Sequence, residues 1–217
     1  MKKLFYLLAG PVILTPLAYL WTKWPEVPTR VPVHYGLDGM ADRIGSKSEF
    51  LTMVLVLTGV NVFVLFFLPH IYKIDPRKTA ADNKSRLNGI TFATVILLSL
   101  ITFVMVDNAG AHKLDFQFKW LIALLGAFWC VLGNYMYNIK PNYFAGLRLP
   151  WTLNNEDNWR LTHRLAGKVW FAGGLLVILL SFLLPGPVVP IMFIAIVFIT
   201  ILIPAVYSYR LYLNSGK

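Results

Sequence analysis

A polar segment between two long apolar stretches carries a histidine and two aspartates at a spacing found in metal sites. His34, Asp38 and Asp42 follow one another at intervals of four residues, and imidazole and carboxylate groups are ligands of Zn²⁺. Gly36 and Gly39 lie between them and disfavour a regular helix, so this spacing does not place the three side chains on one face. We therefore expect a hydrogen-bonded histidine and no bound metal or cofactor. A metal-dependent envelope enzyme using these three residues stays an alternative.

A second polar segment, residues 138–168, is the longest connection in the chain. An asparagine at Asn154 and an acid at Asp157 predict an N-cap and a helix from about Asn155. On that helix three basic residues lie four apart and share one face: Arg160, Arg164 and Lys168. We expect this short helix to lie along the membrane interface and contact lipid headgroups.

Motifs for enzymatic chemistry are missing from the sequence. It has no HExxH pair, no glycine-rich phosphate loop and no nucleophile elbow. Its apolar stretches contain essentially no ionisable residues, which pumps and ion-coupled carriers usually place there. We therefore expect a protein that is not an enzyme. A small transporter or exporter of a peptide or lipid stays an alternative. Few polar residues in the spans could line its path: Thr58, Asn61, Ser99, Thr102 and Asn134.

The elements that position these segments are membrane-spanning helices. The chain of 217 residues is 57% hydrophobic and 14% charged, whereas a soluble domain is about a quarter charged. Six apolar runs approach the ~20 residues that cross a hydrocarbon core: 4–21, 50–68, 89–106, 120–137, 169–184 and 188–207. The sequence predicts an all-α polytopic membrane protein with about six transmembrane helices, plus the short interfacial helix before the fifth.

Basic residues are divided unequally between the two predicted sides of the membrane. Fourteen of the 20 Lys and Arg residues fall at the termini and in the second and fourth connections. Because basic loops are retained in the cytoplasm, both termini and residues 138–168 are predicted inside, and the loop 23–49 outside. This distribution accounts for the formal charge of +10 without a nucleic-acid partner. We expect a protein of the cell membrane, in contact with its lipids, that does not bind nucleic acid directly.

Two modules are predicted along the chain. Residues 1–72 hold the first span, the outer loop 23–49 and the second span, and residues 73–217 hold the remaining four spans. Repeated proline in WPEVPTRVP predicts extended, polyproline-like backbone before the polar segment. After it, glycines predict turns and Ser46 or Ser48 is placed to cap the second span.

Two segments resemble the SdpI family of multi-pass bacterial membrane proteins. The first, WPEVPTRVPVHYGLDGMADRIGSKSEF, is similar to an uncharacterised N-terminal module of many members. It matches at Pro28, Val31, Pro32, His34, Tyr35, Gly39, Asp42 and Lys47. The second, residues 133–174, is similar to the stretch by which the family is recognised. It matches at Asn142, Gly146, Arg148, Pro150, Trp151, Thr152, Leu153, Trp159, Thr162, His163, Arg164 and Gly167.

This resemblance implies a toxin-immunity and signal-relay protein. The family's namesake protects its cell from a secreted sporulation-delaying toxin peptide and captures a small winged-helix repressor at the membrane. The resemblance thus implies an outer ligand-binding surface formed by His34, Tyr35, Gly39, Asp42 and Lys47. It also implies an inner surface for partner docking, formed by Asn142, Gly146, Arg148, Trp151, Trp159, His163 and Arg164.

Overall fold

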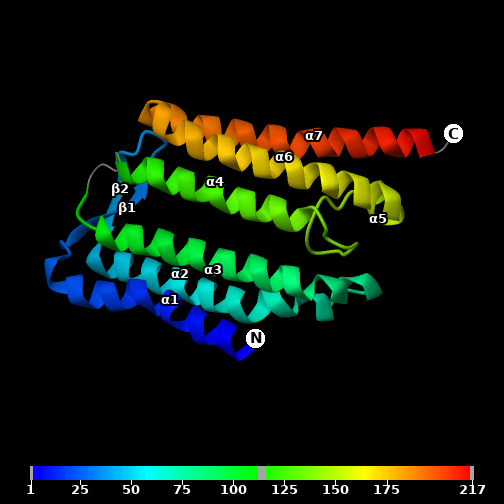
Figure 1. The fold of residues 1–217 in the computed structure, drawn as a ribbon. Helices are drawn as coiled ribbons and strands as arrows, with labels where there is room; N and C mark the ends of the chain where they lie inside the picture. The colour runs from blue at the N-terminus through cyan, green and yellow to red at the C-terminus, as the bar shows by residue number, and fades with distance from the viewer. Residues whose placement is uncertain (1, 112–115, 216–217) are drawn as a thin grey trace.

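In the part of the chain that the structure describes, six long helices run side by side in two groups of three (Figure 1). The computed structural model describes residues 2–111 and 116–215. The first group consists of α1 (Lys2–Lys23), α2 (Lys47–Phe67) and α3 (Lys84–Asp107), with α3 packed against both of the others. The second consists of α4 (Phe116–Met136), α6 (Glu156–Leu183) and α7 (Val189–Ser215), with α6 packed against α4 and α7. Contacts between α3 and α4 join the groups.

Five of these helices, in the part of the chain that the structure describes, are long and apolar enough to cross a membrane: α2, α3, α4, α6 and α7. Large apolar side chains cover their outer faces, with Phe63 60% and Phe198 65% exposed, as a hydrocarbon environment allows. The predicted all-α polytopic membrane fold is confirmed. The first span is not among the five, so the total of six stays a prediction.

The division into modules also stays a prediction. Residues 73–217 include α3, yet α3 packs against α1 and α2, which belong to residues 1–72. The structure therefore groups α3 with the helices that precede it.

Residues 30–46 form a β-hairpin, which the sequence did not predict. Strand β1 (Arg30–Tyr35) pairs antiparallel with β2 (Ala41–Ser46), and a short 3₁₀ turn, Trp24–Glu26, precedes them. The tight turn between the strands needs Gly39, which has φ +76°, a value that L side chains rarely adopt. Pro32 fits because the two-stranded sheet consists of edge strands. We call residues 30–46 the outer hairpin, after their predicted side.

Helix α2 starts directly after the outer hairpin. Ser46 is its N-cap, with its hydroxyl accepting a hydrogen bond from the amide of Glu49 at 3.1 Å. This confirms one of the two predicted caps.

At the opposite end of the bundle the connections are irregular (Figure 1). Two 3₁₀ segments, Leu68–Lys73 and Lys78–Asn83, join α2 to α3, and α5 (Pro150–Asn154) precedes α6. We call residues 138–155 the inner loop. The outer hairpin and the inner loop thus lie at opposite ends of the helices, as the charge distribution predicts, while the orientation in the membrane stays a prediction.

The interfacial helix predicted from about Asn155 is not a separate element. Asn155 is the N-cap of α6, and its side chain accepts from the amide of Asn158 at 2.9 Å. The helix then runs unbroken to Leu183, because no proline interrupts it. Gly167 is tolerated because it lies where α6 meets α4: a Cβ there would lie 2.8 Å from the carbonyl oxygen of Gly133. Such small residues let two helices approach closely.

Candidate functional site

The two strands of the outer hairpin bring His34 and Asp42 together. His34 Nδ1 lies 2.6 Å from Asp42 Oδ1, and both side chains are exposed. Asp38 is turned to its own loop, where it accepts from the amide of Met40 at 3.0 Å. Within the described residues no group of three His, Cys, Asp or Glu side chains is placed to hold a metal ion. The expected hydrogen-bonded histidine is confirmed, and the alternative of a metal-dependent enzyme has no assembled site here.

Tyr35 and Lys47 attach the outer hairpin to the helices. The Tyr35 hydroxyl donates to the carbonyl of Ala111 at 2.8 Å, after the end of α3, and partial burial raises the pKa of Tyr35 above its ordinary value. Lys47 Nζ donates to the carbonyls of Trp24 at 2.6 Å and Val27 at 3.0 Å. It also lies 4.3 Å from the centre of the Trp24 ring. Tyr35 thus ties the hairpin to the segment after α3, and Lys47 ties the turn that leads into the hairpin to α2.

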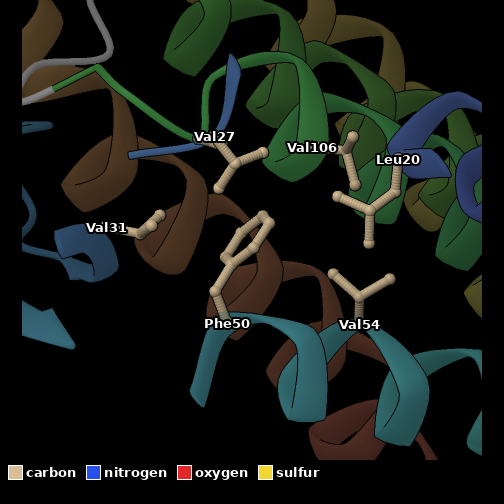
Figure 2. Packing of buried hydrophobic residues seen from close by; sticks show 7 residues of the cluster. Leu20, Val27, Val31, Phe50, Val54 and Val106 are labelled. Atoms are coloured by element: carbon tan, nitrogen blue, oxygen red, sulfur yellow. The ribbon is translucent and has the colours of Figure 1, made fainter. Parts of the chain in front are cut away.

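An apolar cluster beneath the outer hairpin continues into the helices (Figure 2). Val27 and Val31 pack with Phe50 and Val54 of α2, and this cluster also includes residues of α1 and α3. Phe50 is 1% exposed. The hairpin is thus seated on the ends of three helices and does not hang from a flexible linker.

The turn and β2 of the hairpin expose apolar side chains that are not among the residues predicted to bind a ligand. Leu37, Met40 and Ile44 are 58%, 45% and 46% exposed. The sequence signal that could have found them was the presence of large apolar residues within a short polar loop. With the His34–Asp42 pair they give this end of the molecule a surface that is both apolar and polar.

Asn142 shapes the inner loop from within. Its Oδ1 accepts from the amides of Phe144 at 2.9 Å and Ala145 at 2.7 Å, and its Nδ2 donates to the carbonyl of Lys140 at 2.9 Å. Because asparagine side chains satisfy nearby backbone groups in this way, they stabilise turns. Asn142 is buried and sets the course of the loop.

His163 joins the inner loop to α6. Its Nε2 accepts from the amide of Leu147 at 3.0 Å, and its Nδ1 lies 2.8 Å from the carbonyl of Trp159. Because Nε2 accepts a hydrogen bond, the proton of the neutral imidazole is assigned to Nδ1. The ring stacks on Trp159, whose indole donates to Ile139 at 2.8 Å. Gly146 touches the same ring, since a Cβ there would lie 2.4 Å from His163 Nε2.

The connection between α2 and α3 clamps the inner loop from the other side. Asn83 and Lys140 exchange two hydrogen bonds, of 3.0 and 2.8 Å. Asp75 accepts from the amide of Tyr143 at 2.7 Å, and Arg77 donates to Leu153 at 2.5 Å. The inner loop is therefore an ordered surface that spans both helix groups.

The predicted docking residues differ in how accessible they are. Asn142, Trp159 and His163 are buried and are not accessible to a partner. Arg148 and Arg164 are exposed. Trp151, which is partly buried, donates to Ser208 Oγ on α7 at 3.0 Å and stacks on Tyr212.

Two accessible aromatic residues of the inner loop were missed, because spacing alone does not separate exposed from buried positions. They are Tyr143 and Phe144, 43% and 38% exposed.

Beside the inner loop lies a cleft of about 280 Å³. Charged residues of both signs line it, among them Lys140, Asp82, Asp157, Arg160 and Arg164. The cleft therefore offers hydrogen bonds and ion pairs to a polar partner, and does not select strongly for one sign of charge.

Polar residues inside the spans serve mainly to join helices. Asn61 of α2 is buried and donates to the carbonyl of Val95 at 3.2 Å and to Ser99 Oγ at 2.9 Å, both on α3. Thr58 and Thr102 each donate to a carbonyl one turn back in their own helix. Asn134 is different, because it is exposed on α4. Among the described residues, Asn61 and Ser99 bond each other, and no other hydrogen bond joins two members of this set.

Comparison with known proteins supplies the family. Residues 138–208 match the model of the SdpI/YfhL protein family, and residues 12–58 match a domain of unknown function, DUF1648. The chain is 35% identical over 211 residues to the immunity protein SdpI of Bacillus subtilis (strain 168), covering 95% of this chain and 97% of that one. The chain belongs to the SdpI family. No solved structure matches it.

The two matched regions correspond to the two ends of the molecule. The SdpI match begins at the inner loop and continues through α6 into α7, and the DUF1648 match contains the outer hairpin. The resemblance predicted from the two sequence segments is thereby confirmed. The long apolar helices and the named relative support a membrane immunity protein of the SdpI family.

Proposed function

We propose that this SdpI-family protein protects its cell against a secreted toxic peptide and, in response, captures a transcriptional repressor of the winged-helix class at the membrane. The observation that carries the proposal is the match to an immunity protein along nearly the whole chain. The two structured ends add a physical basis for it, since one surface is needed for the peptide and another for the repressor.

In this proposal the peptide binds the outer hairpin. Leu37, Met40 and Ile44 offer exposed apolar area, and the His34–Asp42 pair offers exposed hydrogen-bonding groups beside it. Tyr35, Gly39 and Lys47 act by keeping the hairpin in its place and shape. A preformed surface favours binding because the protein loses little conformational entropy when the ligand binds.

The signal crosses the membrane through the helices on which the hairpin sits. Tyr35 holds the end of α3, and α3 begins at the connection that clamps the inner loop through Asn83. A peptide shifts this assembly only if it binds one arrangement of the helices more tightly than another. The repressor then docks on the accessible inner residues Arg148, Tyr143 and Arg164.

Protection is tested by expressing the chain in toxin-sensitive cells and adding the sporulation-delaying toxin peptide. Survival above the empty vector is expected. The double variant Leu37→Asp, Met40→Asp is expected to lose protection, because two charges disrupt the apolar surface. Ile74→Asp is the matched control: Ile74 is 62% exposed at the opposite end. Membrane levels are compared by immunoblot. Survival equal to the vector, at normal levels, would refute the immunity role.

Repressor capture is tested with a fluorescent fusion of the namesake's winged-helix repressor. We expect it to move to the membrane when the peptide is added. Arg148→Ala combined with Tyr143→Ala is expected to abolish this movement while survival is retained. If the parent protein never recruits the fusion, the relay part of the proposal fails even when protection is present.

A further inference from the structure

The geometry points to a binding site for one anionic phospholipid in a groove between α4 and α6. The groove has a volume of about 390 Å³ and is lined by Gly133, Asn134, Tyr137, Gly167, Lys168 and Phe171. Gly133 and Gly167 lie where the backbones of α4 and α6 meet, since a Cβ on Gly133 would lie 2.6 Å from the amide nitrogen of Phe171. The two helices lie against each other along their length (Figure 1). The site concerns a different ligand from the immunity role, and it shares Arg164, at its edge, with the proposed repressor surface.

The charge around the groove selects for an anion. None of its lining residues is acidic. Lys168 is exposed, and neither it nor Arg164 has an ion pair among the described residues, whereas Arg160 is paired with Asp157 at 2.8 Å. Arg164 lies over the ring of Tyr137 at 6.0 Å from its centre, so a second cation stands beside the groove. A phosphodiester headgroup matches both charges.

Uncharged polar groups complete the headgroup end. The side-chain amide of Asn134 is exposed, and no hydrogen bond among the described residues involves it or the hydroxyl of Tyr137. A polar group facing lipid needs a hydrogen-bonding partner because hydrocarbon supplies none. The glycerol ester and phosphate oxygens of a phospholipid are such partners.

An apolar track leads away from the groove along the same face of α6. Phe171, Leu175 and Leu179 follow Lys168 at spacings of three or four residues, so they share its side of the helix. They are 45%, 51% and 57% exposed. One helix face thus runs from basic to aromatic to aliphatic, in the order of headgroup, glycerol and acyl chain. This order favours a whole lipid over a free phosphate ion.

The binding test uses the purified full chain and native mass spectrometry. The protein is exchanged into detergent containing either phosphatidylglycerol or phosphatidylcholine, and the retained lipid is counted. We expect one phosphatidylglycerol to be retained preferentially. Lys168→Gln should weaken its retention roughly fivefold, the effect expected for one basic residue near an anionic headgroup. Asn134→Leu should weaken it as well. Lys84→Gln, also exposed and before α3 enters its apolar run, is the control and should change nothing.

A second measurement separates the lipid from its phosphate. Phosphatidylglycerol is expected to raise the melting temperature of the parent protein, whereas inorganic phosphate at equal concentration is not. The lipid-free melting temperatures of Lys168→Gln and Asn134→Leu should equal that of the parent, because both side chains are exposed. Equal retention of the two lipids, equal retention by Lys168→Gln and the parent, or the same shift with phosphate would each overturn the proposal.

Discussion

Both ring nitrogens of His163 are engaged within the chain. One faces the amide of Leu147 and the other the carbonyl of Trp159, so neither is left for a metal or a partner. Histidine is often a site of acid–base chemistry because its charge changes near neutral pH. Here the neutral ring serves as a bridge between α6 and the inner loop. Its place in the family motif is explained by this bridge.

Gly146→Ala should destabilise the inner loop. Gly146 has φ +109°, and an added Cβ would meet His163 Nε2. A side chain in such backbone costs about 1–3 kcal/mol, and the contact with His163 adds to it. We expect a lower melting temperature in detergent and loss of repressor recruitment. Gly186→Ala, where no atom lies within 4 Å of the new Cβ, is the control. An unchanged melting temperature for Gly146→Ala would contradict this role.

Lys47→Met should loosen the outer hairpin and not merely weaken a ligand contact. The change removes two hydrogen bonds to carbonyls and the contact with Trp24. Each hydrogen bond to a charged group contributes about 1.5–3 kcal/mol. The melting temperature without peptide should therefore fall, and protection with it. Lost protection at an unchanged melting temperature would instead assign Lys47 to direct peptide binding.

Residue types and spacing identified the inner motif but not the role of each member. Asn142, His163 and Arg148 are all polar, so the sequence alone does not show which of them is buried. In the structure Asn142 and His163 are buried and Arg148 is exposed. Burial depends on partners far along the chain, such as Ile139 for Trp159 and Ser208 for Trp151. A single sequence does not reveal these pairs.

At the scale of elements, long apolar runs predicted the membrane helices well because length and hydrophobicity alone decide such segments. The outer hairpin was missed for a different reason. Its prolines favour extended backbone without indicating a pairing partner, and Pro32 lies opposite Ile44 only because the turn at Gly39 folds the chain back. The cap at Ser46 was predicted because it depends on neighbouring residues only.

Phe50→Ala should weaken the packing of the outer hairpin against the helices. Removing a buried phenylalanine costs about 3–5 kcal/mol, and Phe50 lies in the cluster that joins the hairpin to α1, α2 and α3. We expect faster hydrogen exchange in residues 30–46 and loss of protection. Phe198→Ala, on the exposed face of α7, is the control and should leave exchange in the hairpin unchanged. Unaltered exchange in Phe50→Ala would show that other contacts seat the hairpin.

Asn61→Leu should weaken the α2–α3 pair modestly. It removes the bonds to Val95 and Ser99, and such hydrogen bonds between membrane helices contribute roughly 0.6–2 kcal/mol. The melting temperature should fall slightly while protection is retained. A loss of protection without a change in melting temperature would indicate a transport path, the alternative that the sequence left open.

The whole molecule places two structured surfaces at opposite ends of one helix bundle (Figure 1). Charge counting predicts which end faces outward, and labelling of single cysteines tests it. Leu37→Cys should react with an impermeant maleimide in intact cells, and Phe144→Cys only after the cells are opened. The native Cys130 is buried, so the parent protein should remain unlabelled. Labelling of Phe144→Cys in intact cells would reverse the orientation.

The contacts of the inner loop and the start of α6 with α7 have a consequence for the synthesis of the protein. Trp151 and Asn158 both bond Ser208, which the ribosome adds some fifty residues after them. During synthesis the inner loop therefore lacks the bond from Trp151, and the start of α6 lacks the bond from Asn158, until α7 has been added. A chain released early, or one whose last helix fails to insert, would present an incomplete inner face. If the proposed repressor capture requires the complete inner face, only finished molecules would perform it.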